Sequence, residues 1–194
     1  MSASADRRSL LDAVFSDLRP DEQIYVFEKP GKDRRLFDSI QAVIDYADQH
    51  SNSDLYFGVA PRVRGSFDSP SRVTAIWVDI DYKDFGDDPK KAQNALAEFP
   101  LLPNFVISSG NGLHAYWLLM DSVPPRRAQD DLMKPLCDLI GADATHNPDR
   151  VLRIPGTKNW KDPDNPKDVT VLRDKALPLH LSRDIEALMN TSAK

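Results

Sequence analysis

The sequence predicts an α+β fold made of an N-terminal αβ unit and a following split βαβ unit. The first 62 residues alternate between helix and strand. From Arg72 the order becomes strand, helix, strand, strand, helix and strand, which is the order of the ferredoxin-like or RRM-like fold. Apolar residues at helical spacing mark the helices, and short apolar runs bounded by Gly or Pro mark the strands.

Each unit has its own expected elements. In the first unit we expect helices at 2–18 and 36–50 and strands at 23–29 and 54–62. In the second we expect strands at 72–82, 103–109, 113–119 and 150–156 and helices at 89–99 and 125–141, followed by a strand at 168–173 and a last helix. The strand at 72–82 is apolar on both faces until its end, as in a covered central strand. We therefore divide a single domain into an αβ lobe (1–71), an RRM-like lobe (72–161) and a C-terminal extension (162–194).

Composition and charge exclude several classes of protein. Hydrophobic residues make up 41% and charged residues 28% of 194, which is ordinary for a globular domain and excludes disorder and collagen-like fibres. The net charge of -5 argues against a basic coat for non-specific nucleic-acid binding, although residues 150–161 contain four cations and no acid. Cys137 is the one cysteine, so we expect neither a disulfide nor a zinc site. With no signal peptide or apolar membrane span, we expect a cytoplasmic protein that does not contact membranes.

Two aspartates end the apolar strand of the second unit. Asp79 and Asp81 are two residues apart, so their side chains point to the same face of the strand. Burial of two like charges so close together is unfavourable unless a cation neutralises them. Mg²⁺ or Mn²⁺, which prefer oxygen ligands, would neutralise this pair. The alternative is an exposed strand end that leads into a polar loop.

A glycine-containing turn follows the next strand. It consists of Ser108, Ser109, Gly110, Asn111 and Gly112. Glycine permits positive φ and close approach of a ligand, and such turns cradle phosphate oxygens with their N–H groups. His114 lies just past the turn, where its imidazole would donate to a triphosphate. The alternative is a plain hairpin with a half-buried histidine.

A third segment, GADATHNPDRVLRIPGTKNWK, combines acids and cations. Asp143 would supply a further carboxylate, and Arg150, Arg153 and Lys158 are suited to phosphate. The alternative is a solvated basic loop, with Asp149 as the ion-pair partner of a nearby arginine. If the three segments meet on one face, their carboxylates and cations suit phosphoryl or nucleotidyl transfer by two metal ions.

These motifs together resemble the archaeo-eukaryotic primase superfamily, and in particular the primase-polymerases of phages, plasmids and mobile elements. The family's hydrophobic strand ending in DxD corresponds to VDID (78–81), and its small-x-His segment to GLH (112–114). Its later aspartate before a basic strand corresponds to Asp143 and then RVLRIPGTKNWK. YFGVAPR (56–62) is similar to the end of the N-terminal unit in the mobile-element branch, so the resemblance covers about residues 54–161.

The resemblance implies an RRM-like catalytic half packed on an N-terminal αβ half, with the site between them. It implies template-directed synthesis or extension of primers from nucleoside triphosphates on single-stranded DNA, with a two-metal Mg²⁺ or Mn²⁺ site. Asp79, Asp81 and Asp143 would hold the metals, and Asp149 is the alternative third ligand. The family implies nucleotide contacts from Arg62, His114, the Ser108–Gly112 turn, Arg150, Arg153 and Lys158. A helicase or further domains of a longer chain are additional candidate partners.

Other functions remain as alternatives to a primase. A non-catalytic RRM-like nucleic-acid-binding replication module would display aromatic residues on its sheet, and Tyr116 and Trp117 offer little of this. A nickase-type initiator needs a His-x-His pair, which none of the four histidines forms. A nucleotide-sugar transferase would use the DxD but leave RIPGTKN without a role.

Overall fold

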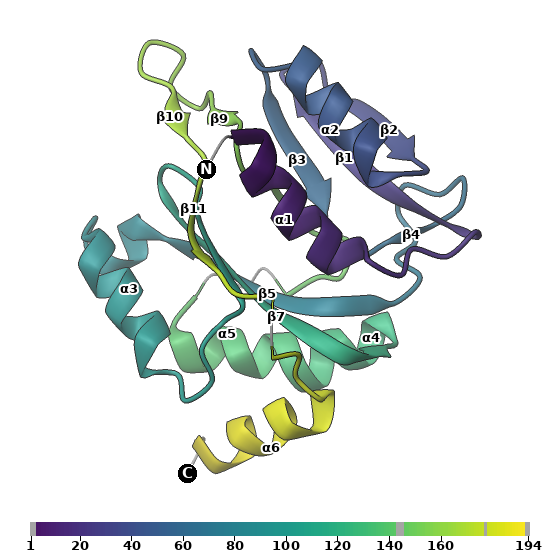
Figure 1. Cartoon of the computed structure of the whole chain (residues 1–194). Coiled ribbons are helices and arrows are strands. Elements are labelled where there is room, and N and C mark those ends of the chain that lie inside the picture. Colours follow the sequence, from purple (N-terminus) through teal and green to yellow (C-terminus); the bar gives the residue numbers. More distant parts are fainter. Residues whose placement is uncertain (1–2, 143–145, 177, 193–194) are drawn as a thin grey trace.

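The computed structural model describes residues 3–142, 146–176 and 178–192. Two antiparallel sheets lie one above the other, with helices packed on both (Figure 1). This mixed architecture confirms the α+β class expected from the sequence. One contiguous hydrophobic core runs through both sheets, and its largest fully buried side chains include Trp77, Trp117 and Phe57.

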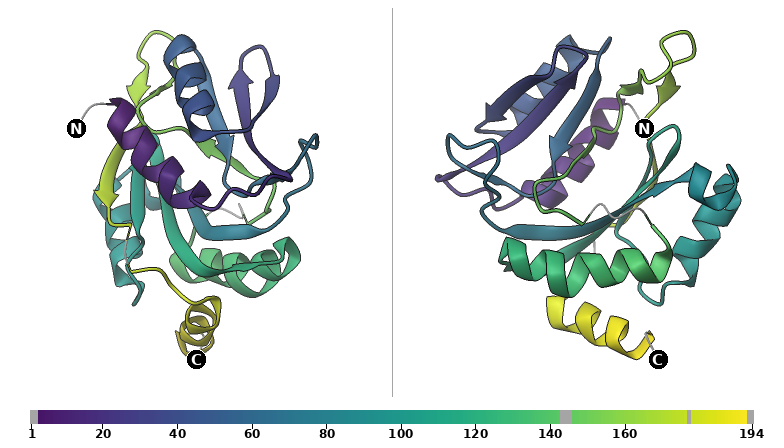
Figure 2. Two further views of the ribbon diagram at one scale, coloured as in Figure 1. Left: turned by 45° about the vertical axis from the view of Figure 1, so that its right-hand side comes forward. Right: turned by 180° about the vertical axis from the view of Figure 1, so that it is seen from behind.

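The first sheet combines the N-terminal half of the chain with one later strand. Its order is β2 (Asp33–Phe37), β1 (Glu22–Lys29), β3 (Asp54–Gly58) and β8 (Val151–Arg153), and β4 (Arg62–Val63) also pairs with β1. The helices α1 (Ala3–Phe15) and α2 (Ile40–Gln49) pack against each other and cover one face of this sheet (Figure 1). Seen from behind in Figure 2, the strands lie in front of both helices, which leaves the other face uncovered by them.

Strand β2 is absent from the sequence prediction. The segment DRRLF has no apolar alternation, because it is a partly exposed edge strand with two exposed arginines. It forms because β1 offers a free edge for backbone hydrogen bonds. The expected helix at 36–50 therefore begins only at Ile40, where the Ser39 side chain caps it by accepting from the Ala42 N–H.

The second sheet has the order β11 (Thr170–Asp174), β6 (Phe105–Ser108), β7 (Gly112–Val123) and β5 (Val73–Asp81). The 3₁₀ helix η1 (Tyr82–Phe85) and α3 (Pro89–Glu98) follow β5. Below the sheet lie α4 (Pro125–Arg127), the π-helix η2 (Ala128–Met133), α5 (Lys134–Ile140) and α6 (Ser182–Ser192) (Figure 1). A short ribbon of β9 (Lys158–Asn159) and β10 (Lys167–Asp168) stands apart (Figure 1).

The strand expected at 150–156 does not complete the second sheet. Only Val151–Arg153 is extended, and this strand pairs with β3 of the first sheet. β11 joins the second sheet instead, on the edge formed by β6, so β5 is at one end of the hydrogen-bonded order rather than central. β5 is nevertheless buried along most of its length, because the first lobe covers one side and the helices cover the other.

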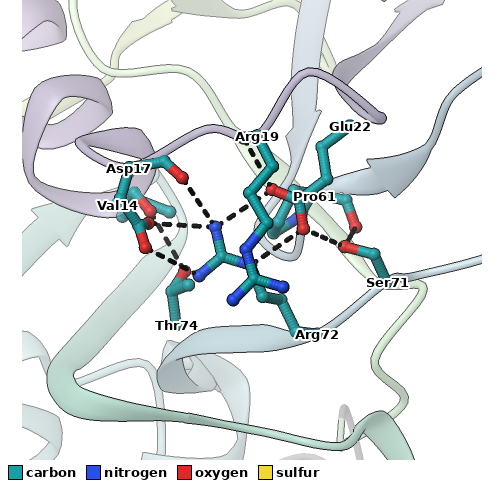
Figure 3. A network of polar contacts seen from close by, with 8 residues as sticks. All are labelled: Val14, Asp17, Arg19, Glu22, Pro61, Ser71, Arg72 and Thr74. Atoms are coloured by element: carbon teal, nitrogen blue, oxygen red, sulfur yellow. Dashed lines mark hydrogen bonds and ion pairs between the residues drawn. The ribbon is translucent and has the colours of Figure 1, made fainter.

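A buried ion-pair network joins the start of β1 to the start of β5 (Figure 3). Arg72 donates from Nε to Oε1 of Glu22 at 2.8 Å and from Nη2 to Oε2 at 3.0 Å. Arg72 also bonds Asp17 beyond α1, and Ser71 Oγ donates to Glu22 Oε1 at 2.6 Å. Burial tends to raise the pKa of Glu22, but hydrogen bonds from Arg72 and Ser71 outweigh it and lower the pKa to about 2. The network thus ties the two sheets together.

Replacing Glu22 with Gln tests this tie. A pKa lowered from 4.5 to about 2 corresponds to about 3 kcal/mol of stability at 1.36 kcal/mol per unit. This contribution is present at neutral pH and is lost as the pH falls from about 5 towards 2, because the unfolded chain binds the proton more readily. We expect Glu22→Gln to lower the free energy of unfolding by about 2–3 kcal/mol at pH 7, and by much less near pH ~3, in urea titrations.

The control is Glu98→Gln, at an exposed position on α3. It should change stability by less than about 0.5 kcal/mol at either pH. A loss for Glu22→Gln that is as large in acid as at neutral pH would contradict a buried, ionised Glu22.

Candidate active site

The two expected metal-binding aspartates lie at the C-terminal end of β5. Asp79 pairs in register with His114 of β7, and Asp81 pairs with Gly112. The side chains of Asp79 and Asp81 are 21% and 29% exposed, so each carboxylate is partly shielded and still open to solvent. Their spacing puts both on the sheet face that looks toward the first lobe, as predicted from the strand period.

His114 is buried directly beside Asp79. Its Nε2 lies 3.6 Å from Oδ1 of Asp79. Burial lowers the pKa of His114 and the Asp79 charge only partly opposes this, so the imidazole is neutral at pH 7. Its Nδ1, like the hydroxyl of Tyr116 on the same strand, is buried without a hydrogen-bond partner in the described part of the chain. Buried polar atoms in this state are uncommon and mark a place for a ligand or water.

Each aspartate already has a cationic neighbour. Arg150 donates from Nη2 to Oδ2 of Asp79 at 3.2 Å. Lys83 binds Asp81 twice, from its backbone N–H to Oδ1 at 3.2 Å and from Nζ to Oδ2 at 2.9 Å. Burial tends to raise the pKa of Asp81, but the hydrogen bonds from Lys83 outweigh it and lower the pKa. Each carboxylate is therefore next to a cation that a metal ion would have to compete with.

The Ser108–Gly112 turn connects β6 to β7 beside this pair. Gly110 has φ 91°, a backbone conformation that glycine adopts without strain. Asn159 of β9 donates from Nδ2 to the Ser109 carbonyl at 2.7 Å, and Lys167 of β10 donates to the Asn111 side chain at 2.6 Å. The β9–β10 ribbon therefore holds the turn in place.

A cavity of about 680 Å³ opens next to Asp81 and the turn. Lysines, aspartates and asparagines line it together with the turn. Its lining includes Asp81, Lys83, Gly110, Asn111, Asn159, Lys161 and Lys167. The volume falls within the range of small-molecule sites.

The other cations predicted from the sequence have different surroundings: Arg153 and Lys158 each pair with an aspartate other than Asp79, and Arg62 is buried. Arg153 pairs with Asp54 and lies with its guanidinium 4.7 Å from the centre of the Tyr56 ring. Lys158 is exposed and pairs with Asp168 at 3.2 Å. Arg62, from which we expect a nucleotide contact, is fully buried in this structure.

Arg62 serves as an internal clamp. Its guanidinium donates to the carbonyls of Ala60, Phe67, Pro148 and Asp149. Burial lowers the pKa of Arg62 to about 10, so it stays charged at pH 7. The clamp anchors the segment before Arg150 to the first sheet.

The third metal ligand is not assigned by the described residues. Asp143 lies outside them. Asp149, the alternative, is exposed and binds Arg62 through its carbonyl. Within the described ranges, no group of three or more His, Cys, Asp or Glu side chains is arranged to hold a metal ion.

Comparisons with known proteins give a match only in structure. No protein-family model matches the chain, and no curated protein sequence matches it significantly. The AEP domain of the cyanophage S-2L primase-polymerase matches with a TM-score of 0.68 and 17% identity, over 95% of this chain and 97% of that chain. The catalytic domain of the primase RepB′, solved in complex with initiator DNA, matches with a TM-score of 0.64 and 17% identity, over 100% of this chain and 94% of that chain. A structure of RepB′ matches with the same score and identity over 98% of this chain and 62% of that chain.

This chain has the AEP fold of the primase-polymerases. The resemblance inferred from the VDID, GLH and RIPGTKN motifs is thereby confirmed for the fold. In this AEP fold the first two motifs meet on adjacent strands, and the segment before RIPGTKN brings Arg150 to Asp79. None of the helices in the described AEP fold is long and apolar enough to cross a membrane.

Sequence reasoning missed three residues that shape the site of this AEP fold. Lys83 neutralises Asp81, and Asn159 and Lys167 hold the glycine turn. Asn159 belongs to the RIPGTKN motif, which singles it out, but neither lysine carries a signal beyond its charge. Their roles depend on contacts between segments that are distant in sequence.

Substitution of Gly112 tests how closely β5 and β7 approach each other. A Cβ at this position would lie 2.2 Å from the carbonyl oxygen of Ile80, so the two strands cannot stay at their present distance. We expect Gly112→Ala to lower the free energy of unfolding by about 1–3 kcal/mol, measured by chemical denaturation. Gly31→Ala, where nothing lies within 4 Å of the added carbon, should change it by less than about 0.5 kcal/mol. Equal stability of the two variants would show that the β5–β7 spacing is not tight.

Proposed function

We propose that this chain is a template-directed nucleotidyltransferase that makes or extends primers on single-stranded DNA from nucleoside triphosphates. One observation carries the proposal: in an AEP fold, Asp79 and Asp81 share one face at the end of β5, with buried His114 directly opposite Asp79. The glycine turn and the cavity lie beside Asp81, and Arg150 contacts Asp79. Both the named structural neighbours are primases, and one was solved with initiator DNA.

The donor atoms at the aspartate pair fit Mg²⁺ or Mn²⁺. They are carboxylate oxygens, and Mg²⁺ is commonly held by one or two carboxylates together with substrate phosphates. Two such ions held there would supply the positive charge that lowers the pKa of an attacking 3′-hydroxyl and neutralises the leaving pyrophosphate. Asp79 and Asp81 would hold them, with Asp143 or Asp149 as the expected third ligand.

The remaining groups would bind and orient the nucleotide. Neutral His114 keeps a proton on one ring nitrogen and so offers an N–H donor to a phosphate oxygen. Arg150 is half-exposed and reaches Asp79 with one arm, so its guanidinium is close enough to contact a triphosphate held there. The Ser109 N–H already donates to the Gly112 carbonyl at 2.9 Å. The Ser108–Gly112 turn, held by Asn159, would present the N–H groups of Gly110 and Asn111 to phosphate oxygens. Such fixed donors stabilise charge as it develops during transfer.

A non-catalytic nucleic-acid-binding module is the second candidate. It is favoured by the ion pairs of Arg150 and Lys83, which already balance Asp79 and Asp81. Such a module would bind single-stranded DNA equally well with and without divalent ions. It would incorporate no nucleotide.

A primer-extension and de novo priming assay separates the two candidates. We expect the Asp79→Asn/Asp81→Asn variant to lose at least about 100-fold in the rate of nucleotide incorporation, because it lacks the charge that the ions require. Asp84→Asn removes an exposed aspartate three residues beyond Asp81 and should retain the parental rate. Equal synthesis by the double variant and the parent refutes the assignment. Asp143→Asn and Asp149→Asn in the same assay identify the third ligand by the larger loss.

Arg150 should compete with a metal ion for Asp79. Its removal leaves Asp79 without its guanidinium partner and makes the site more negative. We therefore expect Arg150→Ala to bind Mn²⁺ more tightly than the parent in the absence of nucleotide, by about 3- to 10-fold, as measured by Mn²⁺ electron paramagnetic resonance. Arg150→Lys, which keeps the charge, should bind like the parent. Weaker Mn²⁺ binding by Arg150→Ala would contradict the competition.

A further inference from the structure

The face of the first sheet that α1 and α2 leave uncovered carries two half-buried aromatic rings. Alternate residues of β1 and β3, such as Val26 and Phe57, are buried in the core. Phe27 and Tyr56 point to the opposite face and are half-buried. They do not belong to the hydrophobic core or to the partly buried residues packed on it. Packing in the hydrophobic core therefore does not explain why Phe27 and Tyr56 are aromatic.

These rings form the centre of one cross-strand row. The register pairs Arg34 of β2 with Phe27, Phe27 with Tyr56, and Tyr56 with Arg153 of β8. Neighbouring strands are about 4.8 Å apart, so the row runs about 14 Å straight across the sheet. The sequence of side chains along it is cation, aromatic, aromatic, cation.

A lysine lies over the two rings. The Phe27 and Tyr56 ring centres are 6.1 Å apart, and Nζ of Lys29 is 5.7 Å from one and 5.3 Å from the other. Arg34 and Arg153 each have a carboxylate partner, Asp68 and Asp54. Lys29, by contrast, forms no ion pair within the described residues and is exposed, so its charge is available to an anion.

The row leads directly to the aspartate pair. Arg153 ends the row on β8, and Arg150, just before the same strand, donates to Asp79. Burial is the main cause of the raised pKa of Tyr56. Arg153 opposes it, and the charges of Asp54 and then Asp79 add to it, so Tyr56 and Asp79 are within electrostatic reach of each other. A strand of nucleic acid lying on the row would thus end at the candidate active site.

We propose that the row Arg34–Phe27–Tyr56–Arg153, with Lys29 above it, is the surface on which the single-stranded DNA template lies. Aromatic rings on an open sheet stack nucleobases, and adjacent cations contact the phosphates. A protein with net charge -5 has little general electrostatic attraction for DNA. Such a local platform would therefore supply most of its affinity for DNA. This inference rests on the proposed function, because it names the position of the template for that site.

Binding of single-stranded DNA without divalent ions tests the platform. The probe is a labelled oligodeoxynucleotide of mixed sequence and about 12 nucleotides, followed by fluorescence anisotropy at several salt concentrations. We expect Phe27→Leu to weaken binding by about 5- to 100-fold without changing the salt dependence, because it removes a stacking ring but no charge. Lys29→Ala should weaken binding and reduce the slope of log affinity against log salt by about 0.7, since one phosphate contact is lost.

Two control variants show whether a loss of DNA binding comes from the platform itself. Lys134→Ala removes the same charge from an exposed position on α5, below the second sheet, and should leave binding unchanged. Phe27→Trp keeps an aromatic ring and should bind within about twofold of the parent, which separates stacking from general damage to the fold. Parental binding by Phe27→Leu overturns the proposal. So does an equal loss in Phe27→Trp, or a loss in Lys134→Ala that matches Lys29→Ala.

The DNA-binding test of the platform can be interpreted whether or not the chain is a polymerase. Phe27 is not in contact with the aspartate pair, so Mn²⁺ binding by Phe27→Leu should equal that of the parent. If the parent makes no primers but Phe27→Leu still loses DNA binding, the proposed function fails and the platform stands. If the parent makes primers and Phe27→Leu binds DNA normally, the platform alone fails.

Discussion

The antiparallel pairing of β5 with β7 is the constraint on which the candidate site depends. One register puts Asp79 opposite His114 and Asp81 opposite Gly112. A slip of one residue would turn both carboxylates to the opposite face, which packs against η2 and α3 and where burial of the two charges would be unfavourable. Gly112 allows this pairing to close, since any side chain there would meet the Ile80 carbonyl. The positions of the side chains in the candidate site therefore depend on a close backbone contact between β5 and β7.

The site also depends on how the two sheets are held together. The Arg72–Glu22 network joins the start of β5 to the start of β1, and the Arg62 clamp fixes residues 148–149 against the first sheet. Arg150 follows this clamped segment and bridges to Asp79 on the second sheet. The two buried arginines, Arg62 and Arg72, thus help to position the half-exposed Arg150. Every nitrogen of both buried guanidiniums donates at least one hydrogen bond, which offsets the cost of burying these charges.

Much of the fold follows from local patterns, and the exceptions share a cause. Helical and strand periodicities predict α2, α3, β1, β3, β5, β6 and β7 to within a few residues. The polar edge strand β2 has no such pattern, because an edge strand is held by backbone hydrogen bonds that any sequence can make. The pairing of β8 with β3 also escapes prediction. Periodicity describes which face of a strand is buried, but it does not say which neighbour provides the burial.

By itself, the sequence determined the chemistry that each segment carries: two same-face carboxylates after an apolar strand, a glycine turn before a histidine, and a basic run free of acids. Only the tertiary structure decided how each cation is used. Arg150 meets Asp79, Arg153 meets Asp54, and Arg62 is enclosed among carbonyls. A guanidinium binds whichever acceptors are near, and nearness here comes from residues up to 99 positions apart in the chain. Residue type and spacing therefore predict what a side chain can bind, whereas the packing of the two sheets decides what it does bind.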